Sequence, residues 1–280
     1  MAQSMRIFDN HLHLSPTGQG VDAAKLFEES GGTALVLTHM PYHDIHVRTA
    51  KDYETAFRRT LDMGKAVRNG TGLKVYVAVG PYPVELIRLI DSVGREKAIE
   101  THMEAMDMAG RLFKEGEIIA IGEIGRAHFP VEADKQEACN EVMRYGMKVA
   151  KEVGCAVVLH TEAPTPAVCE ELAGFADSVG LPREKVVKHF SGPIVKHEDN
   201  RGLMPSVLSR EENIVKAVQQ GDRFFMETDY MDDPRRPGAV LSPATVPKRT
   251  KALIERGIMS EDVAKAVHED WPFRIYGIET

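Results

Sequence analysis

The chain has 280 residues, of which 43% are hydrophobic and 28% charged, and its formal net charge is −7. This composition excludes a disordered chain, and the acidic balance excludes loose electrostatic binding to nucleic acid or to an acidic membrane. The length suits either two small domains or one α/β barrel of about 250 residues.

The cysteines and the apolar runs indicate the compartment. Cys139, Cys155 and Cys169 form no Cys-x-x-Cys pair, so neither a disulfide framework nor a zinc ribbon is expected. The first residues lack the apolar core of a signal peptide, and no run of about 18 apolar residues occurs. We expect a cytoplasmic protein that does not enter a membrane.

Strand-like and helix-like segments alternate along the chain. Short β-branched or apolar runs predict strands at 7–14, 33–38, 73–79, 118–123, 155–160, 185–189, 203–208 and 223–229. Helical spacing predicts helices at 21–30, 49–68, 83–93, 96–115, 133–153, 164–180, 209–221, 246–256 and 261–269. The form Ser209-x-x-Glu212 predicts a capping box at the start of the helix 209–221.

Eight strands alternating with helices indicate parallel pairing, in either a closed barrel or an open doubly wound sheet. An open sheet more often carries a glycine-rich phosphate loop after its first strand, and Asn10 to His13 is no such loop. Nothing in the composition divides the chain. We therefore predict a single-domain (β/α)₈ TIM barrel over residues 1–280.

Polar side chains occur where the predicted strands end. They are His11, His13, Glu123, His160, His189 and Asp229. His11 and His13 are two apart and therefore face the same side of an extended strand. In a barrel all of these ends meet at the face that carries active sites, where they could hold a divalent ion. Turn histidines and helix-capping carboxylates are the alternative interpretation.

These segments, in this order, resemble the TatD-type branch of the metal-dependent amidohydrolase superfamily. The matching stretches are Asp9-Asn-His11-Leu-His13, Gly122-Glu123-Ile-Gly125, Val158-Leu-His160, Lys188-His189-Phe-Ser-Gly192, Met226-Glu-Thr-Asp229-Tyr230 and Arg274-Ile-Tyr-Gly277. The resemblance implies a (β/α)₈ barrel and hydrolysis on one to three divalent ions.

By this resemblance His11, His13 and Asp229 would hold one ion and His160 and His189 a second, with Glu123 as a catalytic bridge. Asp229 would take the proton of the attacking water and return it to the leaving group. A mixed shell of imidazoles and carboxylates leaves Zn, Mn and Mg open, although four imidazoles favour an ion other than Mg²⁺.

Two departures from the family pattern concern the substrate. The usual Leu-Asp after Gly-Glu-Ile-Gly is replaced by Arg126-Ala127-His128, and Glu162 stands where an arginine could hold phosphate. The expected substrate-binding residues are Arg126, His128, Arg235 and Arg236. The connection 191–209 is long enough to act as a lid.

Three functions follow, in order of preference. The first is a hydrolase of a phosphodiester, including the 3′ end of a DNA strand. The second acts with the same centre on a small ester, lactone or amide, and the third is a metal-binding barrel without catalysis. The oligomeric state is left open.

Overall fold

Nine parallel strands form one sheet in the protein, whose computed structural model describes residues 5–280. They are β1 (Phe8–His13), β2 (Ala34–Thr38), β3 (Lys74–Val79), β4 (Ala120–Gly125), β5 (Ala156–His160), β6 (Val186–Lys188), β7 (Met204–Leu208), β8 (Phe225–Glu227) and β9 (Tyr230–Met231). The order is β8-β7-β6-β5-β4-β3-β2-β1-β9. Only Thr228 and Asp229 separate β8 from β9, and β9 pairs with β1. The sheet therefore curls round on itself, which confirms the predicted TIM-barrel fold.

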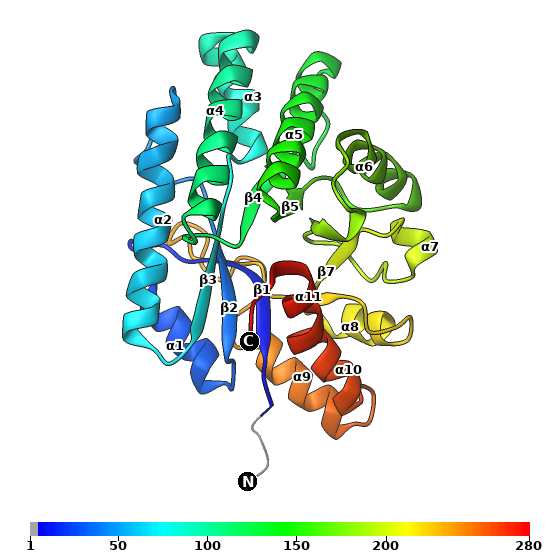
Figure 1. Ribbon diagram of the computed structural model, residues 1–280. Coiled ribbons are helices and arrows are strands. Elements are labelled where there is room, and N and C mark those ends of the chain that lie inside the picture. The colour runs from blue at the N-terminus through cyan, green and yellow to red at the C-terminus, as the bar shows by residue number, and fades with distance from the viewer. Residues whose placement is uncertain (1–4) are drawn as a thin grey trace.

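Helices follow the strands and lie around the outside of the sheet (Figure 1). They are α1 (Val21–Glu29), α2 (Ala50–Gly70), α3 (Pro83–Val93), α4 (Arg95–Lys114), α5 (Ala133–Val153), α6 (Pro166–Val179), α7 (His197–Asn200), α8 (Glu211–Val218), α9 (Thr245–Glu255), α10 (Glu261–Lys265) and α11 (Trp271–Tyr276). Among residues 5–280, none of the helices is both long and apolar enough to cross a membrane.

The predicted capping box at Ser209 is wrong. Helix α8 starts at Glu211 with Arg210 as its N-cap, without a side-chain cap. The N–H of Ser209 instead donates to the carbonyl oxygen of Glu227 at 2.9 Å, which keeps Ser209 in the extended wall of the barrel. A capping box is present at α2, between Thr49 and Asp52.

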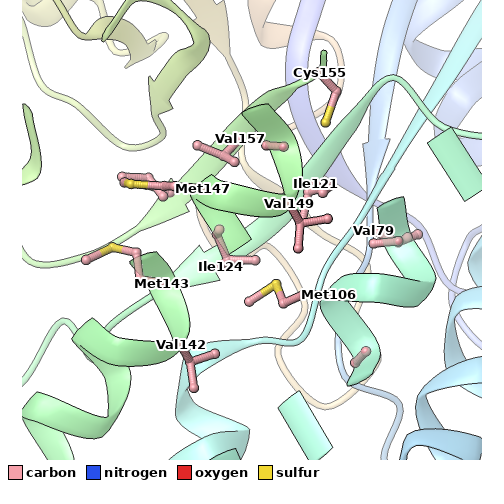
Figure 2. Close-up of a cluster of buried hydrophobic side chains, with 14 of the residues drawn as sticks. Val79, Met106, Ile121, Ile124, Val142, Met143, Met147, Val149, Cys155 and Val157 are labelled. Atoms are coloured by element: carbon pink, nitrogen blue, oxygen red, sulfur yellow. The ribbon is translucent and has the colours of Figure 1, made fainter. Parts of the chain in front are cut away.

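A hydrophobic layer between the sheet and α4 and α5 holds β4 and β5 in place (Figure 2). Its side chains include Val79, Met106, Ile121, Ile124, Val142, Met143, Met147, Val149, Cys155 and Val157. Burial of each large side chain contributes roughly 1.5–3 kcal/mol. The layer fixes the two strands that end in Glu123-Ile-Gly125 and His160. All three cysteines are free and buried, as packing residues would be.

The segment 191–209 is part of the barrel wall over much of its length. It contains α7 and β7, and Val195 and Asn200 are both buried. The side-chain amide of Asn200 donates to the carbonyl oxygen of Val195 at 2.8 Å. A role as a lid stays a prediction.

Candidate metal centre

The six polar residues predicted at strand ends meet in one place. His11, His13, Glu123, His189 and Asp229 are buried, and His160 is half-buried. The Nε2 atoms of His11 and His13 are 3.2 Å apart. The six side chains form two groups, each with one potential ligand atom per residue and all of those atoms within 4.8 Å of one another.

The first group is His11, His13 and Asp229. Oδ1 of Asp229 lies 3.8 Å from Nε2 of His11 and 3.5 Å from Nε2 of His13. The backbone of Asp229 is left-handed, with φ of 47°, and its N–H donates to the carbonyl oxygen of His11 at 2.9 Å. A non-glycine residue held in this conformation costs about 1–3 kcal/mol. The fold therefore maintains strain that directs this carboxylate at the two imidazoles.

The second group is Glu123, His160 and His189. Oε2 of Glu123 is 3.5 Å from Nδ1 of His160, and Oε1 is 3.2 Å from Nε2 of His189. Oε1 also lies 2.8 Å from Nε2 of His11, so the carboxylate connects the two groups. Nδ1 of His160 is buried and has no hydrogen-bond partner among the described residues. A buried nitrogen without a partner beside a carboxylate has the chemistry of a ligand for a divalent cation.

Gly125 allows the ends of β4 and β5 to lie close together. A Cβ atom on Gly125 would be 2.1 Å from the carbonyl oxygen of His160, and its φ is 139°. The N–H of the next residue, Arg126, donates to that same oxygen at 2.9 Å. Only glycine fits here, and the contact sets the height of His160 relative to Glu123.

Two groups that orient the histidines were not assigned from the sequence. Glu227 is fully buried, and its Oε1 lies 3.2 Å from Nδ1 of His189. The carbonyl oxygen of Thr38 lies 2.9 Å from Nδ1 of His13. A partner of this kind fixes which ring nitrogen is free to bind a metal. Glu227 is the last residue of β8, two residues before Asp229, and this position in the sequence could have indicated it. A backbone carbonyl leaves no sequence signal.

The charges in the centre depend on one another. Burial opposes ionisation of Glu123, but the charges of His189 and His160 and the hydrogen bond from His11 hold its pKa well below the usual value. Burial also opposes protonation of His11, yet the hydrogen bond and charge of Glu123 raise its pKa to about 9. Burial and the charge of His11 hold the pKa of His189 well below the usual value. Glu123 is thus held as a carboxylate, and protonation in the centre is favoured on His11 and opposed on His189.

Arg126, one of the four expected substrate contacts, is buried and already paired. Its guanidinium donates to both carboxylate oxygens of Glu162, to Glu171 at 2.7 Å and to Asn140 at 3.2 Å. Burial lowers the pKa of Arg126, but the hydrogen bonds that its guanidinium donates to Glu171 and Glu162 outweigh this effect and raise the pKa. A phosphate could reach this guanidinium only if an ion pair opened, so its role as a substrate contact stays a prediction.

His128 lies at the centre itself, because its Nδ1 is 2.8 Å from Nε2 of His160. Arg235 is exposed in the loop after β9, where its guanidinium contacts Asp233 at 3.2 Å and Nδ1 of His43 at 2.8 Å. Arg236 is exposed in the same loop.

The charge of Arg236 acts on Tyr82, whose hydroxyl is 3.4 Å from Nε2 of His160. Burial and the charges of Glu123 and Asp229 raise the pKa of Tyr82, and Arg236 opposes that rise.

Comparisons with known proteins agree with this geometry. A protein-family model described as TatD related DNase matches residues 8–277. An uncharacterized protein of Methanocaldococcus jannaschii is 35% identical over 280 residues, which is 99% of this chain and 98% of that protein.

Two solved structures share the fold. The structure of a TatD homologue from Escherichia coli has a TM-score of 0.66 at 18% identity, covering 99% of this chain and 100% of that one. A phosphotriesterase-like lactonase variant from Deinococcus radiodurans has a TM-score of 0.62 at 17% identity, covering 99% and 97%. The family match covers nearly the whole chain and includes the site residues, so the chain belongs to the TatD-related DNase family of hydrolases.

Proposed function

We propose that this protein is a divalent-metal-dependent phosphodiesterase that acts at the end of a nucleic-acid strand. The proposal is carried by one observation: Glu123 joins two groups of potential ligands in one cluster of largely buried side chains. Membership of a family described as DNases supports the choice of a phosphodiester.

The donor set fits two divalent ions. His11, His13 and Asp229 would hold one ion, His160 and His189 the other, and Glu123 would contact both. Bound there, such ions would make a water molecule more acidic and neutralise the charge that develops on the phosphoryl oxygens. Zn²⁺ and Mn²⁺ suit four imidazoles better than Mg²⁺ does.

Side chains of the protein would transfer the proton, orient the metal ligands and contact the substrate. Asp229, with a small exposed fraction of its side chain, would accept the proton of the attacking water and return it to the leaving oxygen. Glu227 and Thr38 would hold the rings of His189 and His13 in the orientation that binds metal. Arg235 and Arg236 would contact phosphates of the strand beyond the scissile bond.

A second candidate is the hydrolysis of a small uncharged ester or lactone with the same centre. Glu162 favours it, because this partly exposed carboxylate lies where an anionic strand would need a cation. A solved structure of similar fold is that of a lactonase.

A substrate panel tests the proposal. The chelator-stripped protein is reloaded with Zn²⁺, Mn²⁺ or Mg²⁺ and assayed with 3′-labelled single-stranded DNA, bis(p-nitrophenyl) phosphate, p-nitrophenyl acetate and a γ-lactone. We expect metal-dependent cleavage of the DNA and the phosphodiester. Turnover of the ester or lactone alone would favour the second candidate, and full activity of the stripped protein would refute both.

A further inference from the structure

We propose that a cavity bounded by His128, Phe129 and Glu162 is a substrate subsite for a flat ring that carries an exocyclic amino group. The inference rests on the proposed function and deepens it: for a nucleic-acid end, the ring is a base with an exocyclic amino group, and cytosine is the preferred pyrimidine.

The cavity lies directly beside the metal centre. It has a volume of about 430 Å³, and its lining includes His128, Phe129, Pro130, Val131, Gln136 and Glu162. This volume lies within the usual range for small-molecule pockets. His128 also contacts His160, with 2.8 Å between Nδ1 and Nε2, and the two ring centroids are 5.0 Å apart. Only the imidazole of His128 therefore separates a group in the cavity from His160.

One wall of the cavity is apolar and aromatic. Phe129 is 42% exposed, although large apolar side chains are usually buried in this protein. Its ring meets His128 edge to face at a centroid distance of 5.1 Å, so a face of the ring is free of that neighbour. Exposed aromatic faces bind bases by stacking, with little preference among them. Phe129 thus supplies affinity for a flat ring.

Glu162 supplies a fixed acceptor. The buried guanidinium of Arg126 holds the carboxylate with contacts of 2.9 Å from Nε to Oε2 and 2.5 Å from Nη2 to Oε1. The Glu162 side chain remains 34% exposed. A carboxylate has about four lone-pair sites, so two remain after Arg126 is bound. These sites can accept N–H groups from a ligand.

The cavity offers a phosphate no free cation. Among the described residues its lining contains no Lys or Arg side chain, and the guanidinium of Arg126 is already paired with Glu162 and Glu171. The carboxylate of Glu162 would repel an anion and attract an amino group. Carboxylates accept from the N4 amino group of cytosine in known base recognition, whereas the N3–H of thymine lies between two carbonyl oxygens that a carboxylate repels. The cavity therefore discriminates between the two pyrimidines.

The test uses the metal-loaded protein and two p-nitrophenyl phosphodiesters, one of deoxycytidine and one of thymidine. We expect kcat/KM to favour the deoxycytidine ester by at least about fivefold. Glu162→Gln should abolish this preference by lowering kcat/KM for the deoxycytidine ester. Phe129→Ala should raise KM for both esters by about tenfold, because stacking does not distinguish them.

Matched controls separate the subsite from the fold. Glu170→Gln removes an exposed carboxylate that pairs with Arg201 rather than Arg126, and Phe273→Ala removes a distant phenyl ring that is 64% exposed. Both should keep the preference and KM of the parent. An equal kcat/KM for the two esters in the parent, or an unchanged preference in Glu162→Gln, would overturn the subsite.

Binding distinguishes failure of the subsite from failure of the proposed function. Calorimetric titration of the metal-loaded protein with deoxycytidine and with thymidine needs no turnover. Tighter binding of deoxycytidine that is lost in Glu162→Gln supports the subsite even when no phosphodiester is cleaved. Equal or absent binding of the two nucleosides overturns it.

Discussion

The imidazole of His189 and the carboxylate of Glu227 face each other inside the barrel wall, with Nδ1 and Oε1 3.2 Å apart. The same oxygen accepts the N–H of Phe190 at 2.7 Å, and Ser206 donates its hydroxyl to the other oxygen. The carboxylate is therefore fixed on three sides. His189 is left with Nε2 directed at Glu123, as a ligand of the second ion requires.

Loss of the Glu227 carboxylate should weaken metal binding. We expect Glu227→Gln to reduce the affinity for the ion that His160 and His189 would hold by about 10- to 100-fold, because a neutral amide orients His189 less firmly. Competition with a chromophoric chelator measures this. The matched control is Glu211→Gln, which changes an exposed carboxylate paired with Arg249 and Arg256. Equal affinities in both variants would show that Glu227 does not support the centre.

A methyl group at Gly125 should disrupt the centre. In Gly125→Ala the new Cβ would meet the carbonyl oxygen of His160 at 2.1 Å, at a φ of 139°. We expect at least about 1–3 kcal/mol of lost stability and a large loss of activity, because His160 moves away from Glu123. Gly174→Ala is the control, since its Cβ would meet nothing within 4 Å on an exposed face of α6. In denaturant unfolding, Gly125→Ala should lower the free energy of unfolding relative to the parent, and Gly174→Ala should raise it. A Gly125→Ala variant as stable as the parent would contradict the account.

His268 should make the fold sensitive to acid. Its ring is buried between Phe8 and Thr250, and burial lowers its pKa from 6.5 to about 4. Between these pH values the unfolded chain binds more protons than the folded one, so stability is lost as the pH falls from 6.5 to 4. His268 should therefore lower the free energy of unfolding by about 3 kcal/mol between pH 6.5 and 4, because each pH unit in that window accounts for up to about 1.4 kcal/mol.

The measurement is the free energy of unfolding as a function of pH in the parent and in His268→Gln. Although the variant is less stable at pH 7, its curve should be flatter between pH 6.5 and 4 by the slope of one proton. Parallel curves would show that His268 is not the group that titrates.

The sequence was sufficient to predict the fold and the residues that gather at the strand ends. Periodicity identifies β1 to β8 because each strand is a short apolar run between helices with strong patterns. It does not identify the start of α8, because the N–H of Ser209 is taken by a carbonyl oxygen in another strand. Such long-range pairing leaves no local signal.

The surroundings of the centre were less predictable than its members. Arg126 could be read as a free cation because its partners Glu162 and Glu171 lie 36 and 45 residues away. Only the folded chain shows that this positive charge is neutralised. The cavity beside His128 is likewise made by loops whose relative position the pattern of strands does not define.

The most direct test of the central claim is the number of metal ions bound by the protein. Elemental analysis of the Zn-loaded, dialysed parent should give about two ions per chain. His13→Ala and His160→Ala should each retain about one, with the fold unchanged by circular dichroism and phosphodiester hydrolysis lost. A parent that retains no ion, or variants that retain as many as the parent, would contradict a shared centre built from these six side chains.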